Sequence, residues 1–502
     1  PELSADEPEI DCLQVEMPTL LELLSKKQIL ESEGAAKSLY DFCQTYNVRQ
    51  VQEKGRKYLS CLLMLLINNE LLGKQSNKVF ESLLQVIEKV CNRTVYLVLL
   101  VENKAVLEQL IKLAIASPWV VSQISRTPIL LDELIDPERL YSPPTRENLQ
   151  FELNQIMERI DVDDEEQRMD ALRVFKHVNV LRVAAADLTK AIALMVVSDK
   201  LSEIAEVIIN KAVALSWHTI SQKYGVPKGA VTDQVSDFTV IGFGKLGGIE
   251  LGFGSDLDLV FLHKEIADDE CTQGENSIPL SDFYSRLVRR IILLLTTRTM
   301  SGPLYEIDLR LRPNGNSGLL ISSISSFEKY QLNQSWTWEQ QALIRARPVA
   351  GGKEMATRFN QIRCDVLSQN REPDKLRQDI VDMRQKMRDS LFKEKVGYFD
   401  LKQGYGGIVD IEFIVQFGVL THASENQALL VYTDNIRLLQ ELEKIGYLTP
   451  QQCQQLTQAY QRYREASHHA VLAELRPIVE QTVFEETAQS VETIWNQIFN
   501  KK

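Results

Sequence analysis

The stretch Gly242-Phe-Gly-Lys-Leu-Gly-Gly-Ile-Glu-Leu-Gly-Phe-Gly-Ser-Asp-Leu-Asp-Leu-Val-Phe-Leu262 decides how this chain folds. Directly before it, Phe238-Thr-Val-Ile241 predicts a short buried strand. The glycine-rich part leaves no room for a long helix. The alternation in Leu257–Leu262 then predicts a second strand. We therefore expect two strands joined by a glycine-rich connection.

Two carboxylates in this stretch point to metal chemistry. Side chains of a strand alternate between its faces, so Asp256 and Asp258 project together while Leu257 and Leu259 project to the other side. Two carboxylates on one rigid strand repel each other unless cations lie between them. Such oxygen ligands suit Mg²⁺, which also retains waters and substrate phosphate oxygens.

A third carboxylate lies in Leu304-Tyr-Glu-Ile-Asp-Leu-Arg-Leu-Arg-Pro313, where we expect a strand over 304–311. In that strand Glu306, Asp308, Arg310 and Arg312 would share a charged face opposite an apolar one. We therefore predict that Asp256, Asp258 and Asp308 are catalytic metal ligands. Their arrangement allows two Mg²⁺ ions about 4 Å apart.

Other residues suit a polyphosphate. Backbone N–H groups of Gly247 and Gly248, together with Ser255, are predicted to approach the β- and γ-phosphates. Arg345 and Arg347 stand two apart in a predicted strand over 342–349, where two guanidinium groups on one face suit phosphate oxygens.

The sequence leaves several positions open. Arg310 and Arg312 either bind phosphates or pair with nearby acids, and Lys402 either contacts a nucleotide or is an ordinary exposed lysine. Trp336 and Trp338 can stack on adenine, although packing in the core is the stronger expectation.

Three other interpretations of these residues agree less well with the sequence than a metal site does. A lone Asp-x-Asp is usually a solvated loop, but the glycine-rich lead and the later third carboxylate argue against that here. Gly242-x-Gly244-x-x-Gly247 matches a dinucleotide-binding fingerprint, yet Gly252 and Gly254 leave no room for its helix. A Walker phosphate loop fails because Leu246 stands where Ser or Thr is required.

Together these residues resemble the nucleotidyltransferase superfamily, and more closely the glutamine synthetase adenylyltransferase family. The matching segments are Gly244-Lys-Leu-Gly-Gly248, Ser255-Asp-Leu-Asp-Leu259, Asp308-Leu-Arg-Leu-Arg-Pro313, Trp336-Thr-Trp-Glu-Gln-Gln-Ala-Leu-Ile-Arg-Ala-Arg347 and Gly406-Gly-Ile-Val-Asp-Ile-Glu-Phe-Ile414.

The resemblance implies transfer of AMP from ATP to a tyrosine of glutamine synthetase, with Mg²⁺ as cofactor. It implies lowered glutamine synthetase activity, as part of nitrogen regulation by glutamine and a PII signalling protein. Such enzymes carry two halves, and Trp336-Thr-Trp338 resembles the transferring, C-terminal half. The partner would then be the N-terminal adenylyl-removing half. The alternatives are that removing half, which works by phosphorolysis, and an RNA-end nucleotidyltransferase.

The composition is that of a globular protein, because 25% of the 502 residues are charged and 44% are hydrophobic. A chain of this length predicts two to four domains. Its net charge of −13 argues against non-specific binding of DNA or RNA, because such binding needs a basic surface. We therefore expect no nucleic-acid partner.

Cysteine usage and hydropathy indicate a cytoplasmic protein with no membrane partner. The seven cysteines are scattered without a CxxC pair, as in a protein with reduced thiols. The apolar runs are far shorter than the roughly 20 residues of a membrane span, and there is no secretory signal. The chain opens on Pro1 rather than Met, so we expect an excised half of a longer polypeptide.

We predict an α+β fold, with a small mixed-sheet nucleotidyltransferase core flanked by N-terminal and C-terminal helical domains. The predicted segments are an N-terminal helical region (1–142), helices leading into the core (143–236), the core (237–350) and a C-terminal helical domain (351–502). Within them we expect one helix over 185–198, another over 282–299, a strand over 319–321 and a surface position for His263.

Overall fold

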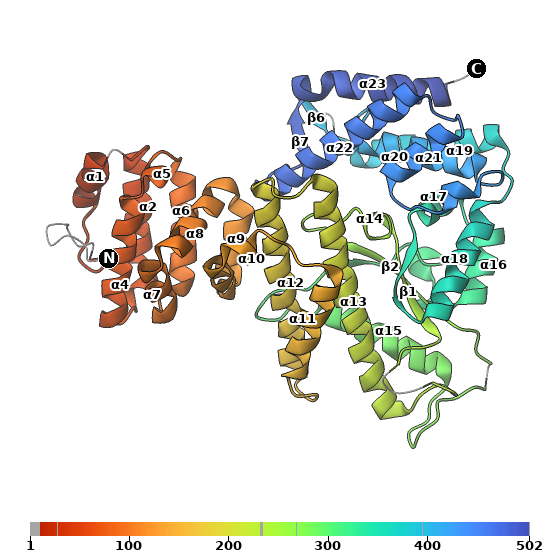
Figure 1. Ribbon diagram of the computed structural model, residues 1–502, viewed down its shortest axis with the longest axis horizontal. Helices are drawn as coiled ribbons and strands as arrows, with labels where there is room; N and C mark the ends of the chain where they lie inside the picture. The colour runs from red at the N-terminus through yellow and green to blue at the C-terminus, as the bar shows by residue number, and fades with distance from the viewer. Residues whose placement is uncertain (1–10, 28, 231–233, 268, 394, 501–502) are drawn as a thin grey trace. The chain divides into compact units, whose positions relative to one another are not determined.

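The computed structural model describes residues 11–27, 29–230, 234–267, 269–393 and 395–500. Its contacts divide the chain into two compact units (Figure 1). Unit 1 holds the described residues up to Pro144, with His177–Ala193 and Leu472–Glu474, and unit 2 holds the remainder. Helices dominate, and small mixed sheets lie among them. The α+β class is therefore confirmed, while the four-segment division stays a prediction.

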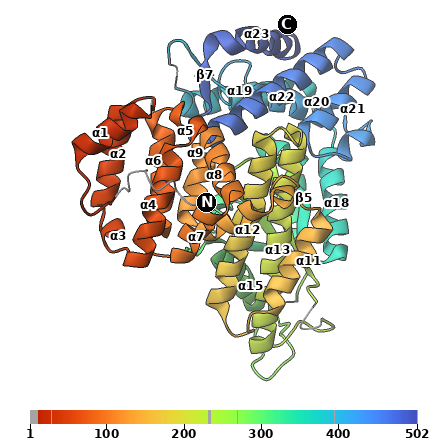
Figure 2. The ribbon, with the colours of Figure 1, turned by 60° about the vertical axis from the view of Figure 1, so that its left-hand side comes forward.

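Unit 1 is built from short amphipathic helices. Its longest are α2 (Ser32–Gln44), α4 (Glu53–Ile67), α6 (Asn77–Val90) and α8 (Lys104–Ala116), and Figure 2 shows them side by side. Apolar residues at three- and four-residue spacing along these helices face inward. The others are α1 (Met17–Lys26), α3 (Tyr46–Arg49), α5 (Glu70–Gly73), α7 (Thr94–Glu102), α9 (Pro118–Arg126), η1 (Pro128–Ile135) and α10 (Pro137–Leu140).

The continuous helix expected over 185–198 is wrong. Helix α12 (Glu165–Leu188) ends there and α13 (Leu194–Tyr224) begins six residues later. Between them Lys190 adopts a left-handed conformation with φ 57°, and the N–H of Ala191 donates back to the carbonyl of Ala186 at 2.9 Å. This is how a helix commonly ends, although glycine usually occupies the left-handed position.

The sheet of unit 2 holds the predicted strand pair at its centre. The two expected strands, β1 (Phe238–Gly242) and β2 (Leu257–His263), are present and pair antiparallel. The sheet order is β3-β2-β1-β5, and β4 also pairs with β2. The outer strands are β3 (Ile307–Asp308), β4 (Ile321–Ser323) and β5 (Arg347–Gly351). Pairing of β2 with β3 is parallel and sets Asp258 opposite Asp308.

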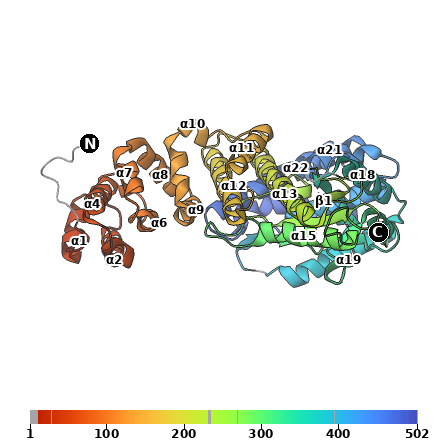
Figure 3. The ribbon, with the colours of Figure 1, turned by 90° about the horizontal axis from the view of Figure 1, so that it is seen from below.

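Helices cover both faces of this sheet. Helix α13 contacts β5, and α15 (Leu280–Thr296), which runs beside α13 (Figure 3), contacts β3 and β4. Helices α16 (Ile324–Asn333) and α18 (Lys353–Leu367) also contact the sheet. Alternate side chains of β2 therefore enter different cores: Val260 and Leu262 join the cluster shared with the C-terminal helices, whereas Phe261 stacks on Phe238.

His263 is buried, so the predicted surface role is wrong. It is 8% exposed, and its ring stacks on Tyr284 with 4.9 Å between the centroids. Burial lowers its pKa. The strand continues one residue further than the pattern indicated, which places the histidine under α15.

Two expected strands are shorter than predicted, and a third is shifted. Instead of 304–311, only Ile307–Asp308 is a strand, because the carboxylate of Asp308 accepts the N–H of Arg310 at 2.8 Å and turns the chain. Instead of 342–349, helix α17 (Thr337–Ile344) precedes β5. That helix begins where Glu339 accepts the N–H of Trp336 at 2.8 Å. The expected strand 319–321 lies at β4.

The C-terminal helices complete unit 2. They are α19 (Pro373–Leu391), α20 (Ile408–His422), α21 (Asn435–Lys444), α22 (Pro450–Leu472) and α23 (Gln481–Phe499). Strands β6 (Tyr398–Asp400) and β7 (Ile478–Glu480) form a separate antiparallel pair. The remaining elements are α11 (Arg146–Glu158), α14 (Gly244–Gly247), η2 (Gly315–Ser317) and η3 (Gln427–Leu430).

Trp336 and Trp338, expected to pack inside, are 70% and 37% exposed. All seven cysteines are free thiols. None of the described helices is long and apolar enough to cross a bilayer.

The central strand provides a test of the fold. Phe261 is 1% exposed, so Phe261→Ala should lower the free energy of unfolding by about 3–5 kcal/mol through loss of buried contacts and an unfilled cavity. Urea denaturation followed by tryptophan fluorescence measures this. Leu319→Ala is the control, because Leu319 is 78% exposed and should change stability by less than about 0.5 kcal/mol. Equal effects of the two changes would contradict the strand assignment.

Candidate active site

Three carboxylates gather where β2 and β3 pair. Asp256 is exposed just before β2, and Asp258 faces Asp308 across the two strands. Burial, followed by the negative charges of Asp256 and Asp308, raises the pKa of Asp258 to about 6. This crowding of like charges is what a bound cation would relieve. The structure therefore brings the three predicted residues together.

Asp308 is paired with Arg310. The Arg310 Nε donates to both carboxylate oxygens at 3.0 and 2.8 Å, and its Nη2 donates to Oδ2 as well. These hydrogen bonds hold the pKa of Asp308 below its usual value. The pair lines an open cavity of about 430 Å³ formed by Asp256, Glu306, Ile307, Asp308, Leu309, Arg310, Arg312 and Asn316.

Glycines let the chain approach these carboxylates closely. Gly244, at φ +56°, opens α14, and a Cβ there would lie 2.3 Å from Oδ2 of Asp258. A Cβ on Gly247 would lie 1.9 Å from the carbonyl oxygen of Arg345, and one on Gly248 would lie 2.8 Å from the Arg345 guanidinium. Glycine is required at Gly244 by its positive φ and at Gly247 by the backbone beside it, and a side chain at Gly248 would have to displace the Arg345 guanidinium.

The predicted phosphate contacts of Gly247 and Gly248 need a correction. Their N–H groups donate to the carbonyls of Phe243 and Gly244, at 2.9 and 3.0 Å, inside the turn of α14. They are therefore not presented to a ligand. The Ser255 hydroxyl accepts the N–H of Gly252 at 3.1 Å in the turn just before Asp256. Its phosphate role stays a prediction.

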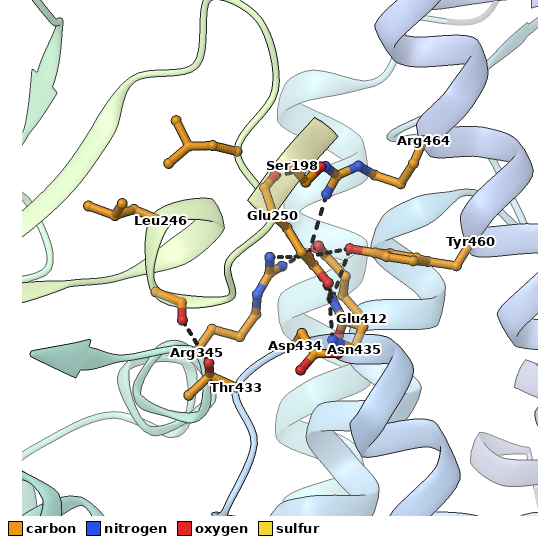
Figure 4. Close-up of polar contacts among 12 residues, drawn as sticks. Ser198, Leu246, Glu250, Arg345, Glu412, Thr433, Asp434, Asn435, Tyr460 and Arg464 are labelled. Atoms are coloured by element: carbon orange, nitrogen blue, oxygen red, sulfur yellow. Dashed lines mark hydrogen bonds and ion pairs between the residues drawn. The ribbon is translucent and has the colours of Figure 1, made fainter. Parts of the chain in front are cut away.

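A fully buried carboxylate, Glu250, follows the glycine turn (Figure 4). Arg345 forms an ion pair with it, the Tyr460 hydroxyl donates to it at 2.6 Å, and the backbone N–H of Asn435 donates at 3.1 Å. Arg464 lies 3.5 Å from the same carboxylate and also donates to the Glu250 carbonyl at 2.8 Å. Burial alone would raise the pKa of Glu250, but Arg345 and Arg464 hold it below its usual value.

Arg345 and Arg347 lie beside the turn, but the prediction that they share a strand is wrong. Arg345 ends α17, whereas Arg347 begins β5. The Arg345 guanidinium pairs with Glu250 and Glu412, and that of Arg347 pairs with Glu206. Arg347 also donates to the carbonyls of Leu246 and Gly247. Both guanidinium groups are thus engaged by acids and backbone, and their binding of nucleotide stays a prediction.

Lys245 supplies positive charge near Asp256, and Lys402 lies near Lys245. Lys245, in α14, and Lys402, before the Gly404–Gly407 turn, are both exposed and close enough to influence each other. Surrounding protein, followed by the positive charges of Lys402 and Arg464, lowers the pKa of Lys245 to about 8. The sequence did not single out Lys245, and Gly-Lys-Leu before the carboxylates was the available signal.

The carboxylate cluster fits a divalent cation chemically. All three side chains offer the hard oxygen atoms that Mg²⁺ prefers, and their mutual repulsion raises the pKa of Asp258. Among the described residues, however, no group of three His, Cys, Asp or Glu side chains is set to hold one ion as it stands. Asp308 is turned to Arg310 instead.

Comparison with known proteins decides the family. Residues 107–362, about half of the chain, match the family model described as glutamate-ammonia ligase adenylyltransferase. The chain belongs to that family. Residues 376–477, in the C-terminal helices, match a model described as PII-uridylyltransferase.

Relatives of this adenylyltransferase-family chain cover most of its length. Each is described as a bifunctional glutamine synthetase adenylyltransferase/adenylyl-removing enzyme. That of Methylococcus capsulatus is 47% identical over 83% of this chain and 44% of its own length. The protein of Pseudomonas syringae is 43% identical over 93% of this chain and 49% of its own length. The protein of Idiomarina loihiensis is 42% identical over 99% of this chain and 52% of its own length. The chain thus spans about half the length of the curated relatives it matches.

The buried contacts of Glu250 with Arg345 and Arg464 provide a test of what holds the site together. Glu250→Gln should cost about 3–5 kcal/mol of unfolding free energy, because it leaves Arg345 and Arg464 as buried charges without their partner. Urea titration measures it. Glu328→Gln is the matched control, since Glu328 pairs with the half-exposed Arg358 and should cost less than about 1 kcal/mol. Wild-type stability of the Glu250 variant would refute the role given to these contacts.

Proposed function

We propose that this chain transfers AMP from ATP to a tyrosine of glutamine synthetase. The observation that carries the proposal is the register that sets Asp258 against Asp308, with Asp256 two residues away. Family membership supports the reaction, and the printed descriptions of the relatives support the substrate.

Asp256, Asp258 and Asp308 would hold Mg²⁺, in one or two ions. When bound, the metal neutralises phosphate charge and orients the reacting groups. Lys245 and Lys402 would bind the polyphosphate, because Lys245 is an accessible cation near Asp256 and Lys402 is an accessible cation near Lys245. Ser255, Arg345 and Arg347 remain predicted nucleotide contacts in this proposal.

The transfer forms a bond between the tyrosine oxygen and the α-phosphorus and breaks the bond to pyrophosphate, which leaves. The phenol proton passes to a carboxylate oxygen of Asp308, because that residue lines the open cavity where a phenol can reach it. Positioning and charge neutralisation carry most of such a reaction.

The wider role proposed here follows from the family. Modification would lower glutamine synthetase activity in nitrogen regulation, under control of glutamine and a PII signalling protein. The adenylyl-removing half would be the further partner, because the relatives carry both activities in their descriptions. A cytoplasmic location agrees with the seven free thiols.

The removing reaction is the second candidate, since this chain spans about half of each bifunctional relative. One experiment separates the possibilities. The chain is incubated with Mg²⁺ and α-³²P-ATP, and with either glutamine synthetase or single-stranded RNA. Label on glutamine synthetase, on a tyrosine-containing tryptic peptide, is the expected result. ADP released by phosphate from modified glutamine synthetase, without labelling, indicates the removing half. Label on RNA ends alone would overturn the protein-substrate proposal.

Asp258→Asn tests the carboxylate cluster. It should reduce AMP transfer below a tenth of the wild-type rate, because metal-assisted neutralisation is worth several kcal/mol. Without metal its melting temperature should hold or rise, since the change relieves repulsion among the three carboxylates. The control is Asp382→Asn on the exposed face of α19, which should retain both the rate and the melting temperature. A fast Asp258→Asn enzyme would exclude Asp258 as a metal ligand.

A further inference from the structure

Arg310 and Arg312 stand two residues apart and are used differently. The Arg312 guanidinium donates to backbone carbonyls of Leu309, Asn316 and Gly318, so it holds the loop after β3 together. The side-chain hydrogen bonds found for Arg310 within the described residues all go to Asp308. Arg312 is therefore structural, whereas Arg310 is committed to a predicted metal ligand.

The contacts of Arg310 occupy the whole carboxylate of Asp308. Oδ1 accepts the backbone N–H and Nε of Arg310, and Oδ2 accepts Nε and Nη2. Asp258 and Asp256 are also near enough for their negative charges to act on the guanidinium. Arg310 is thus the cation that faces all three carboxylates.

A carboxylate held in this way is not available to a metal ion. This agrees with the finding that the described His, Cys, Asp and Glu side chains form no three-membered ligand group. The Arg310 side chain is 73% exposed and lines the same cavity of about 430 Å³. It can therefore leave Asp308 and stay in the cavity without disturbing the core.

We propose that Arg310 is an exchangeable counter-cation: it neutralises the carboxylate cluster while no divalent ion is bound, and it binds nucleotide phosphate once that ion takes Asp308. The proposal rests on the proposed function. An arginine suits both tasks, because its planar group makes paired hydrogen bonds to carboxylate and to phosphate.

The test uses Arg310→Gln and two titrations of the full chain. Mn²⁺ alone should bind about two- to fivefold more tightly to the variant than to the wild type, the range that an exposed ion pair is worth. In the presence of saturating Mn²⁺, α,β-methylene-ATP should bind at least about tenfold more weakly, because a charge-assisted hydrogen bond is lost. Free Mn²⁺ is counted by electron paramagnetic resonance, and nucleotide binding is measured by calorimetry.

The control is Arg358→Gln, which breaks another arginine–carboxylate pair, with Glu328, and should change neither affinity. Opposite shifts in the Arg310 variant support the proposal. Unchanged Mn²⁺ affinity, or unchanged nucleotide affinity, overturns it while leaving the metal site in place. Absence of Mn²⁺ binding by the wild type overturns the metal site itself, and with it both this proposal and the proposed function.

Discussion

The buried charge of Glu250 constrains the rest of unit 2. A carboxylate that is 0% exposed is costly unless charges and hydrogen bonds compensate it. The compensation comes from Arg345 at the end of α17, from Asn435 at the start of α21, and from Tyr460 and Arg464 on α22. Three parts of the chain must therefore meet at one point, directly behind the glycine turn.

This meeting point determines the site. Arg345 can reach Glu250 because Gly247 and Gly248 leave space where any side chain would collide with it. Thr433 fixes the same turn from the other side, donating to the Gly247 carbonyl at 2.7 Å. The turn carries Lys245 and, through Gly244, lies against Asp258. The glycines so close to the three carboxylates thus let the protein pack closely against itself.

The sequence predicted those features that depend on residues close together in the chain. The alternation of polar and apolar side chains placed Asp258 and its apolar neighbours on opposite faces of β2. Prediction failed where a single side chain redirected the backbone, as Asp308 does after β3 and Glu339 does before α17. It also missed the two ion pairs of Arg345. Its partners Glu250 and Glu412 are 95 and 67 residues away in sequence, so a local sequence pattern cannot predict these ion pairs.

The most direct test of this account is amide hydrogen exchange across the glycine turn. In the wild type the N–H groups of Gly247, Gly248, Ile249 and Glu250 all donate within the turn, so the peptide over 244–252 should exchange slowly. The account predicts that Glu250→Gln, and more weakly Tyr460→Phe, accelerates exchange in this peptide while peptides from β1 and β2 remain protected. Unchanged protection over 244–252 in the Glu250 variant would contradict the claim that the buried carboxylate holds the turn and the site in place.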